Sequence, residues 1–421
     1  DDVDLDTLLR HADHAMYQAK QAGRNRHRLF NVEGDIFFSQ KQQQLNEIEQ
    51  ALINNEFSLY YQPKVHMLTG EVFGVEALIR WVHPEKGLIP PLDFLPAIEG
   101  TELELKIGDW VVNQALAQLE DWNINGIKLE VSINISSHHL QSELFYNQLD
   151  KALAKHPSVD SKSLQLEILE SSALGDLDVI SGIIKTCQEA LGVNIALDDF
   201  GTGYSSLTHL RNLSANTIKI DQTFVRDILD DPNDYAIIEG VIGLANAFNR
   251  KIIAEGVETT EHGLMLLIMG CNDAQGYGIA EPMPAEGFSD WLNNYQPNNE
   301  WRVFGSKNRT VKENKIMLFQ LITACWINRF SVNITSQPES VTLWPNIRNK
   351  RDHCGQWIKR EKQDALFDKE VLLKLEQAHK DFHLIAQSLQ LKYQSGEIDT
   401  ARAGLAELQV AFKKMSNVLE S

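Results

Sequence analysis

Two adjacent carboxylates, Asp198 and Asp199, are the residues of this 421-residue chain whose spacing points most directly to chemistry. They follow an apolar run, Val193 to Leu197, which has the character of a buried strand, and the turn Gly201-Thr202-Gly203 comes shortly afterwards. Neighbouring carboxylates at a strand end repel each other unless a cation lies between them. The pair predicts a metal-dependent site. On the dipeptide alone, a helix cap followed by a solvated turn explains it equally well.

Polar side chains also lie in, or directly after, five other apolar runs. They are Glu76, Asn134, Glu167, Lys219 and Glu255. In a parallel barrel the carboxyl ends of all strands meet on one face. Oxygen ligands suit Mg²⁺ or Mn²⁺, and shared carboxylates suit a two-metal site. Lys219 and Glu255 are suited to orient and deprotonate a water. One such residue is more often a cap, but their recurrence on six strands disfavours that explanation.

Three further residues have both a functional and a structural interpretation. Arg80 is suited to clamp a phosphate, and a surface ion pair explains it equally well. Gln62 and Gln275 lie at strand edges, where each could bind a base edge or cap a turn.

Short β-rich runs alternate with helical ones over the middle of the chain, as in a (β/α)8 barrel. The eight candidate strands are residues 58–63, 72–79, 129–135, 164–169, 193–197, 217–220, 251–254 and 273–276. Candidate helices between them are residues 102–122, 179–191, 235–248 and 261–269. A doubly wound open sheet is the alternative, and the lack of a glycine-rich phosphate motif after an early strand counts against it.

The flanking segments have a different character. Residues 5–22 and 38–54 have helical spacing, and together they are too short to hold a core of their own. The polar segment 297–312 is expected to be a linker. Residues 313–421 predict an all-α four-helix bundle, with helices over 316–330, 352–361, 369–394 and 400–419.

The bulk composition excludes several classes of protein. The net charge of −19 argues against binding to long nucleic acid, and the 43% hydrophobic content is ordinary for a globular protein. Four scattered cysteines form no disulfide framework, which favours a cytoplasmic location. No apolar run approaches the roughly 20 residues of a membrane span. Because the chain starts at Asp1, we expect it to be a piece of a longer protein, whose missing segments could attach it to a membrane.

The ordered motifs resemble those of the EAL-domain cyclic di-GMP phosphodiesterases over about residues 40–292. They are Tyr61-Gln62-Pro63, Glu76-Ala77-Leu78, Asn134-Ile135-Ser136, Glu167-Ile168-Leu169-Glu170, Asp198-Asp199-Phe200-Gly201, Lys219-Ile220-Asp221, Glu255-Gly256-Val257-Glu258 and Gln275-Gly276-Tyr277. The resemblance implies a barrel variant with an antiparallel first strand. It also implies hydrolysis of cyclic di-GMP to linear pGpG with Mg²⁺ or Mn²⁺.

The same resemblance implies a role for each matching residue. Lys219 would position the attacking water, and Glu255 would be the general base. Glu170 and Glu258 would anchor the loop that follows Asp199, through which the family couples dimerisation to activity. One departure is Leu169, where the family often has Thr. The implied metal ligands are Glu76, Asn134, Glu167, Asp198 and Asp199, and the implied nucleotide-site residues are Gln62, Leu78, Arg80 and Gln275.

Both flanks carry resemblances of their own. Residues 12–25 resemble the last helix of a GGDEF domain without its catalytic part. The C-terminal segment resembles the chemoreceptor zinc-binding (CZB) domain, whose site has three His and one Cys. His379 and His383 match two of those ligands. Asp352 stands where the cysteine is expected, with His353 and Cys354 beside it as substitutes, and Thr323 stands where the remaining histidine is expected.

The sequence therefore predicts four regions: a GGDEF remnant at 1–33, the EAL phosphodiesterase domain at 34–296, a linker at 297–312 and a helical regulatory domain at 313–421. We expect a cytoplasmic, homodimeric enzyme that binds Mg²⁺ or Mn²⁺ and carries a zinc site in the bundle. The alternatives are a cyclic di-GMP receptor without turnover and an interaction scaffold.

Overall fold

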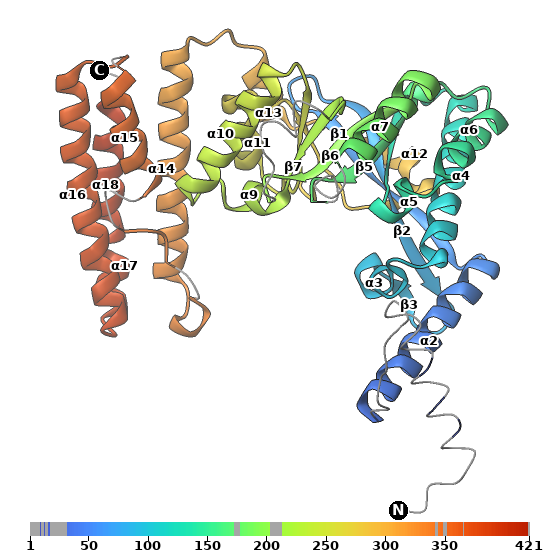
Figure 1. Cartoon of the computed structure of the whole chain (residues 1–421). Coiled ribbons are helices and arrows are strands. Elements are labelled where there is room, and N and C mark those ends of the chain that lie inside the picture. Colours follow the sequence, from blue (N-terminus) through green and yellow to red (C-terminus); the bar gives the residue numbers. More distant parts are fainter. Residues whose placement is uncertain are drawn as a thin grey trace, which may run out of the picture. The chain divides into compact units, whose positions relative to one another are not determined.

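Eight strands close into a barrel in the structure, which is a computed structural model (Figure 1). It describes residues 9, 12, 16, 32–171, 177–202, 213–341, 344–347, 352–364 and 366–419. The predicted helix over 5–22, with its GGDEF resemblance, lies almost wholly outside the described residues. The chain divides into two units, residues 1–59 with 79–113 and residues 60–78 with 114–421, and each is described by itself.

The barrel strands agree with the predicted ones in number and order. They are β1 (Phe57–His66), β2 (Glu71–His83), β4 (Glu130–Asn134), β5 (Leu164–Leu169), β6 (Asn194–Phe200), β7 (Thr217–Ile220), β8 (Lys251–Ala254) and β9 (Asp273–Ala274). Neighbouring strands from β2 through β9 pair in parallel, whereas β1 pairs antiparallel with β9 and also pairs with β2. The predicted (β/α)8 variant with an antiparallel first strand is therefore confirmed.

Two further strands were not expected from the sequence. β3 (Gly87–Ile89) pairs antiparallel with the end of β2, and β10 (Met283–Pro284) pairs antiparallel with β1. Each is only two or three residues long, which is too short for a two-residue alternation of apolar and polar side chains to show.

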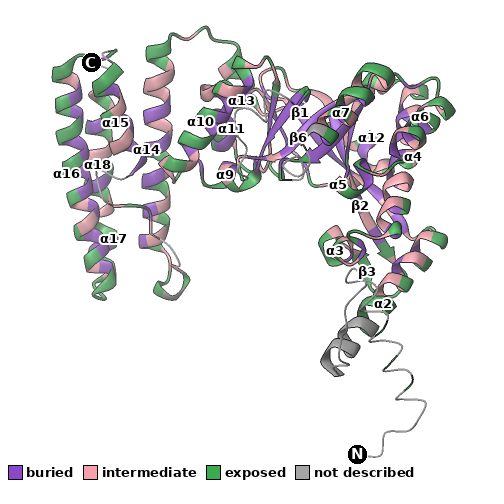
Figure 2. Cartoon of the chain, in the orientation of Figure 1, coloured by how far each residue is buried: buried purple, intermediate pink, exposed green. Residues whose placement is uncertain are grey.

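Helices follow the strands in the larger unit, and the strands themselves are mostly buried (Figure 2). In α10, Ile238, Val241, Ile242 and Ala245 are buried at three- and four-residue steps, so one face of the helix packs inward. The barrel helices are the end of α4 (Glu102–Ile124), α5 (Ser137–Leu140), α6 (Phe145–Lys155), α7 (Leu177–Thr186) with a π-helical turn at Cys187–Leu191, α9 (Gln222–Asp227), α10 (Pro232–Ala247), α11 (Thr260–Met269) and α12 (Ala285–Asn294).

The smaller unit has an aromatic cluster at its centre. Phe57, Trp81 and Phe94 lie with ring centroids 5.4 to 5.9 Å apart, and Trp110 lies 6.0 Å from Phe57. Its elements are α2 (Val32–Ile53), the ends of β1 and β2 that belong to it, β3, a 3-10 turn at Pro91–Asp93, α3 (Leu95–Ile98) and the start of α4. The predicted helix over 38–54 is thus the second half of α2.

The C-terminal segment is helical, as predicted. It contains α14 (Val311–Thr335), α15 (His353–Asp364), α16 (Lys369–Gln394), α17 (Ile398–Ala403) and α18 (Leu405–Asn417). The predicted helix over 400–419 is broken at Gly404, where an added Cβ would lie 2.2 Å from Leu389 Cδ2 on α16. Within the described ranges, no helix combines the length and apolar character that a membrane span requires.

The segment expected to be a linker is partly ordered. It contains α13 (Asn299–Gly305), which Asn298 caps by accepting from the backbone N–H groups of Glu300 and Trp301. Trp301 is 3% exposed, and its Nε1 donates to Thr260 O at 2.9 Å. The segment is mostly polar, so its sequence predicted a linker, although the buried Trp301 fixes it to the rest of the unit.

Candidate active site

The polar residues predicted at strand ends come together at the carboxyl end of the barrel. Asn134 on β4 is the register partner of Glu167 on β5, and Leu169 on β5 is the partner of Asp198 on β6. The side chain of Asn134 also reaches β2, since its Nδ2 donates to Glu76 Oε1 at 2.7 Å. Parallel pairing therefore places residues from distant parts of the sequence side by side.

Lys219 on β7 lies at the centre of this cluster and is completely buried. Its Nζ lies 3.2 Å from Glu76 Oε2, 2.5 Å from Glu167 Oε2, 3.0 Å from Asp198 Oδ1 and 2.6 Å from Glu255 Oε1. An ammonium group has three protons, so it cannot donate to four carboxylates at once. The cluster has more negative charge than its one central cation can neutralise.

The pKa values of the carboxyl groups record this excess. Burial, together with the nearby charge of Glu76, raises the pKa of Glu167 to about 8 against the opposing pull of Lys219. Burial also raises the pKa of Asp199, to about 7, with Asp198 adding to the effect. Burial would raise the pKa of Glu76 too, but Lys219 and hydrogen bonds from Gln275 and Asn134 lower it to about 2. Burial raises the pKa of Glu255 well above its ordinary value, although Lys219 opposes this.

The backbone at Asp199 is unusual. Asp199 has a φ of +53°, a left-handed conformation that is uncommon outside glycine, and the pairing of β6 with β7 shifts register between Leu197 and Phe200. The bulge places Asp199 close to Asp221, whose side chain forms a hydrogen bond with it. Strained backbone of this kind clusters at functional sites.

Two glutamines complete the wall of the site. Gln275 Nε2 donates to Glu76 Oε2 at 2.7 Å and to Gln62 Oε1 at 2.8 Å, while Gln62 Nε2 donates to Ala280 O. Leu78 follows Glu76 on β2 and is half-buried. Arg80 lies further along β2, and its Nη1 donates to Ile79 O at 2.9 Å. Leu78, Gln62 and Gln275 belong to the larger unit, whereas Arg80 belongs to the smaller one.

The loop after Asp199 is held at its start by Glu170. The Glu170 side chain is buried, and its Oε2 accepts from the backbone N–H of Gly201 at 2.8 Å. Glu258 is exposed, and its backbone N–H donates to His262 Nδ1 at 3.4 Å. Residues 203–212 of the loop lie outside the described part of the chain.

The donor atoms suit divalent cations. Glu76, Glu167 and Asp198 form one group of carboxylate oxygens within 4.8 Å of one another, and Asp198, Asp199 and Glu255 form another. The two groups share Asp198, and together they would supply oxygen ligands for a two-metal site. Glu167 Oε1 and Gln275 Oε1 are buried and make no hydrogen bond to the described residues, while Asp198 Oδ1 forms an ion pair with Lys219. Hard oxygen donors left in this state fit Mg²⁺ or Mn²⁺.

A second cluster lies inside the helical bundle. Asp352 Oδ2, His379 Nε2 and His383 Nε2 form a triangle with sides of 3.0 Å, and all three residues are buried. Cys354 forms a group of candidate ligands with Asp352 and His379, in which the ligand atoms lie within 4.8 Å of one another. Its Sγ lies 3.1 Å from the hydroxyl of Thr323, the residue at the expected histidine position. His353 packs against Tyr235 with ring centroids 5.1 Å apart.

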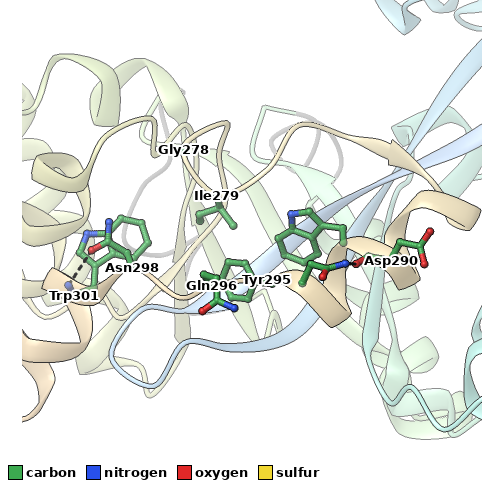
Figure 3. A pocket seen from close by; sticks show the side chains of 9 residues that line it. Gly278, Ile279, Asp290, Tyr295, Gln296, Asn298 and Trp301 are labelled. Atoms are coloured by element: carbon green, nitrogen blue, oxygen red, sulfur yellow. Dashed lines mark hydrogen bonds between the residues drawn. The ribbon is translucent and has the colours of Figure 1, made fainter.

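Figure 3 shows the side chains that line a cavity of about 560 Å³, and none of them belongs to either cluster. It is lined by α12, α13 and the segment around Gly278 and Ile279, and it contains none of the carboxylates of the barrel site. Two of its lining side chains, Trp291 and Tyr295, stack on each other at 4.7 Å, and Asn298 and Trp301 are occupied in capping α13. The cavity therefore adds nothing to the metal cluster.

Two residues that the structure connects to the site were not predicted from the sequence as site residues. Asp221 directly follows the apolar run of β7, as Glu255 follows that of β8, and this repeated position was a usable signal. Lys64 is completely buried on β1 and lies two residues after Gln62. In the sequence its charge suggested an exposed position.

Comparison with known proteins agrees with this geometry. The EAL domain family profile matches residues 45–282. The chain is 40% identical over 280 residues to the bifunctional diguanylate cyclase/cyclic di-GMP phosphodiesterase MucR of Pseudomonas aeruginosa. It is 41% identical over 249 residues to the cyclic di-GMP phosphodiesterase PA2567 of the same organism. These matches cover 66% and 59% of this chain but only 41% and 42% of the relatives, so the chain spans less than half of their length.

A solved structure is similar over the barrel. The PaMucR phosphodiesterase, in its c-di-GMP complex, matches with a TM-score of 0.56 and 40% identity, covering 58% of this chain and 99% of that one. The family profile thus matches more than half of the chain, and a solved domain of the same kind is covered almost completely. This chain belongs to the EAL domain family.

Proposed function

We propose that this chain is a cyclic di-GMP phosphodiesterase that hydrolyses its substrate to linear pGpG. The observation that carries the proposal is the pair of three-carboxylate groups that share Asp198 around the buried Lys219. The names of the MucR and PA2567 relatives supply the substrate class. The carboxylates supply the reaction class, since such sites serve hydrolysis of phosphate esters.

Five side chains would hold two Mg²⁺ or Mn²⁺ ions: Glu76, Asn134, Glu167, Asp198 and Asp199. When bound, the ions polarise a phosphate oxygen and lower the pKa of water, so that hydroxide forms near neutral pH. The buried Glu167 Oε1, which makes no hydrogen bond to the described residues, supports this assignment.

Lys219 and Glu255 are placed to handle the attacking water. Lys219 Nζ would orient the water, and the carboxylate of Glu255 would accept its proton as the new P–O bond forms. The P–O3′ bond breaks on the opposite side of the phosphorus, and the leaving 3′ oxygen takes up a proton. The raised pKa of Glu255 favours its role as a base, because a carboxylate with a raised pKa binds a proton more strongly.

The remaining predicted residues would bind the nucleotide. Gln62, Leu78 and Gln275 would contact the guanine–ribose part, and Arg80 would clamp a phosphate bidentately. Glu170 and Glu258 would hold the loop after Asp199, and the observed bond from Gly201 N–H to Glu170 supports the first half of that proposal.

Substituting a ligand tests these roles. We predict that Glu76→Ala and Asp199→Ala each abolish pGpG formation while circular dichroism shows an intact fold. Each change removes a carboxylate that would neutralise the charge of a bound metal ion. Glu143→Ala, which changes an exposed acidic residue on a turn, is the matched control and should retain activity. Turnover by either ligand variant near the unmodified rate would refute the assigned roles.

We further propose that the helical bundle is a CZB-like regulatory domain that binds Zn²⁺ through Asp352, His379 and His383, with Cys354 or His353 as the fourth ligand. The triangle of 3.0 Å sides supports this, because three ligand atoms around one tetrahedral ion lie at similar separations. In the absence of an ion, burial would raise the pKa of Asp352, but hydrogen bonds from His379 and His383 lower it to about 2. The carboxylate is therefore held ionised, as a ligand must be.

Measuring the zinc content of the purified chain tests this proposal. The purified chain should contain one zinc, His379→Ala should lose it, and Asp381→Ala, an exposed substitution on the same helix, should keep it. Complete loss of zinc from the unmodified chain to a weak chelator, with no change in the bundle, would argue against a tight site.

We also propose that the enzyme works in the cytoplasm as a homodimer through the EAL domain, and that it derives from a protein with a GGDEF–EAL arrangement. All four cysteines are free thiols, which agrees with a reducing compartment. Sedimentation of the purified chain would test the dimer, and a monomer at all concentrations would refute it.

A further inference from the structure

A layer of polar side chains lies inside the barrel directly below the active site. Ser132, Gln165 and Thr217 each stand two residues before a site residue on the same strand, namely Asn134, Glu167 and Lys219. Because side chains two apart in a strand face the same way, the three belong to the next interior level of the barrel. Lys64 on the antiparallel strand β1 joins them from two residues after Gln62.

These four side chains form one hydrogen-bonded row, which we call the Lys64 row: Lys64, Ser132, Gln165 and Thr217. Lys64 Nζ donates to Ser132 Oγ at 2.6 Å, and Ser132 Oγ donates to Gln165 Oε1 at 2.8 Å. Gln165 Nε2 then donates to Thr217 Oγ1 at 3.2 Å. The row connects β1, β4, β5 and β7, and every member is at most 1% exposed.

A buried row of this kind is costly. The interior of a (β/α)8 barrel is normally packed with branched apolar side chains, and an ammonium group loses its hydration when it is buried. Here Lys64 Nζ is compensated by Glu130 Oε1 at 3.2 Å. Glycine at position 74 provides the space, since an added Cβ would lie 3.0 Å from Lys64 Cε and 2.8 Å from Glu130 O.

The charge at the end of the row sets the direction of every bond in it. An ammonium group only donates hydrogen bonds. The Ser132 hydroxyl must therefore accept a hydrogen bond from Lys64 and donate one to Gln165. Gln165 must then present its oxygen to Ser132 and its amide nitrogen to Thr217. Without Lys64, the hydroxyl of Ser132 and the amide of Gln165 could reverse, and the row would have more than one arrangement.

We propose that Lys64 is a positioning residue for the reaction: through the Lys64 row it fixes β4, β5 and β7 at the level just below Asn134, Glu167 and Lys219. The inference rests on the proposed hydrolysis for its kinetic readout, and on metal binding for a readout that is independent of hydrolysis. It assigns no contact with substrate to Lys64.

The test compares three single variants, and the double variant of Lys64→Met with Ser132→Ala, with the unmodified chain. Lys64→Met removes the ammonium and keeps the length of the side chain, and Ser132→Ala cuts the row at its next member. Lys106→Met is the matched control, since it removes the same charge from an exposed lysine whose Nζ lies 2.7 Å from Glu49. Each is measured for kcat and KM with cyclic di-GMP, for Mn²⁺ affinity by calorimetry without nucleotide, and for thermal unfolding.

We expect Lys64→Met to lower kcat by about tenfold or more with KM changed by less than about threefold, because misplaced groups reduce transition-state stabilisation. Its Mn²⁺ dissociation constant should rise. Ser132→Ala should shift both quantities in the same direction, and the double variant should be no worse than Lys64→Met, since both break one row. Lys106→Met should match the unmodified chain.

Three results would overturn the inference. The first is a folded Lys64→Met chain with unmodified kcat and Mn²⁺ affinity, whatever its melting temperature. The second is a double variant whose effect is the product of the single effects. The third applies if Lys64→Met does not fold: it is that both Ser132→Ala and Thr217→Val keep the kcat and the Mn²⁺ affinity of the unmodified chain. Should the unmodified chain show no turnover, the proposed function fails, and the Mn²⁺ affinities still decide the role of Lys64.

Discussion

Glu255 is the residue whose surroundings bear most directly on the reaction. Its carboxylate lies 2.6 Å from Lys219 Nζ and has a raised pKa, so it is both oriented and basic. It also forms a group of three carboxylates with Asp198 and Asp199. A substitution that keeps the shape of the Glu255 side chain tests its role as the base.

We predict that Glu255→Gln lowers kcat by about 10²- to 10⁴-fold, the usual contribution of a general base, with a much smaller change in KM. The amide keeps the shape of the side chain and can still accept from Lys219, so the fold should be retained. Rates of pGpG formation measured by chromatography decide the matter. A variant with more than half of the unmodified rate would exclude Glu255 as the base.

His262 at the start of α11 gives a prediction about pH and stability. Burial lowers the pKa of His262, although Glu258 and the backbone of Arg226 oppose this. The folded chain therefore holds the ring neutral, while the unfolded chain protonates it near pH 6.5. Its contribution to stability is complete above about pH 6.5 and is lost as the pH falls towards the lower folded pKa.

We predict that the free energy of unfolding in urea decreases as the pH is lowered from about 8 to about 5.5. The decrease should be smaller in His262→Gln. Neutral Nδ1 accepts from Glu258 N–H, so protonation also removes a hydrogen bond at the entrance to α11. Equal losses of unfolding free energy in both chains would show that other groups cause the pH dependence.

The residues of the site were predictable from the sequence to the extent that they follow apolar runs. Glu76, Asn134, Glu167, Asp198 and Lys219 each have this context, and the structure places them together. Lys64 could not be predicted, because only the glycine at position 74 and the partner Glu130 on another strand make its burial tolerable. Such compensation depends on residues far apart in the sequence.

At the scale of elements, the loop after β9 holds Gln275 by close backbone contact. An added Cβ at Gly276 would lie 2.2 Å from Val257 N and 2.4 Å from Val257 O, in the segment that follows Glu255. The backbone of the two segments is also paired, since Val257 N–H donates to Gln275 O at 3.0 Å. Glycine at 276 therefore keeps Gln275 against Glu76.

We predict that Gly276→Ala displaces this loop and lowers both turnover and the melting temperature. Loss of the bonds from Gln275 to Gln62 and Glu76 should reduce kcat/KM by at least about tenfold. Gly287→Ala on α12 is the control, because its added Cβ would meet only Pro284 Cγ at 3.9 Å and alanine favours helix. Unchanged activity in Gly276→Ala would show that the loop tolerates displacement.

The boundaries of the elements were predictable where both faces of a strand are buried. The predicted bounds of β5, β7 and β8 agree with the observed ones, since each strand is a short apolar run that stops at a polar residue. It misses β3 and β10, and it runs α17 and α18 together across Gly404. Those features depend on tertiary pairing and on the close approach of Leu389.

At the scale of the whole molecule, the described residues include two sets of side chains, with different chemistry, that are suited to hold metal ions. The barrel offers carboxylate oxygens, which suit Mg²⁺ or Mn²⁺, and the bundle offers two imidazoles, one carboxylate and a thiol, which suit Zn²⁺. The order of elements and the barrel itself were predictable from the alternation of strands and helices. The helix α13 in the segment 297–312 was not predictable, since its stability depends on the burial of Trp301.

The most direct test of the account is incubation of the purified chain with cyclic di-GMP and Mg²⁺ or Mn²⁺, followed by chromatography of the nucleotides. We expect linear pGpG to accumulate, chelation of the ions to stop its formation, and added Mn²⁺ to restore it. Binding of cyclic di-GMP without any pGpG would contradict the account and indicate a receptor, and the absence of both binding and turnover would indicate a scaffold.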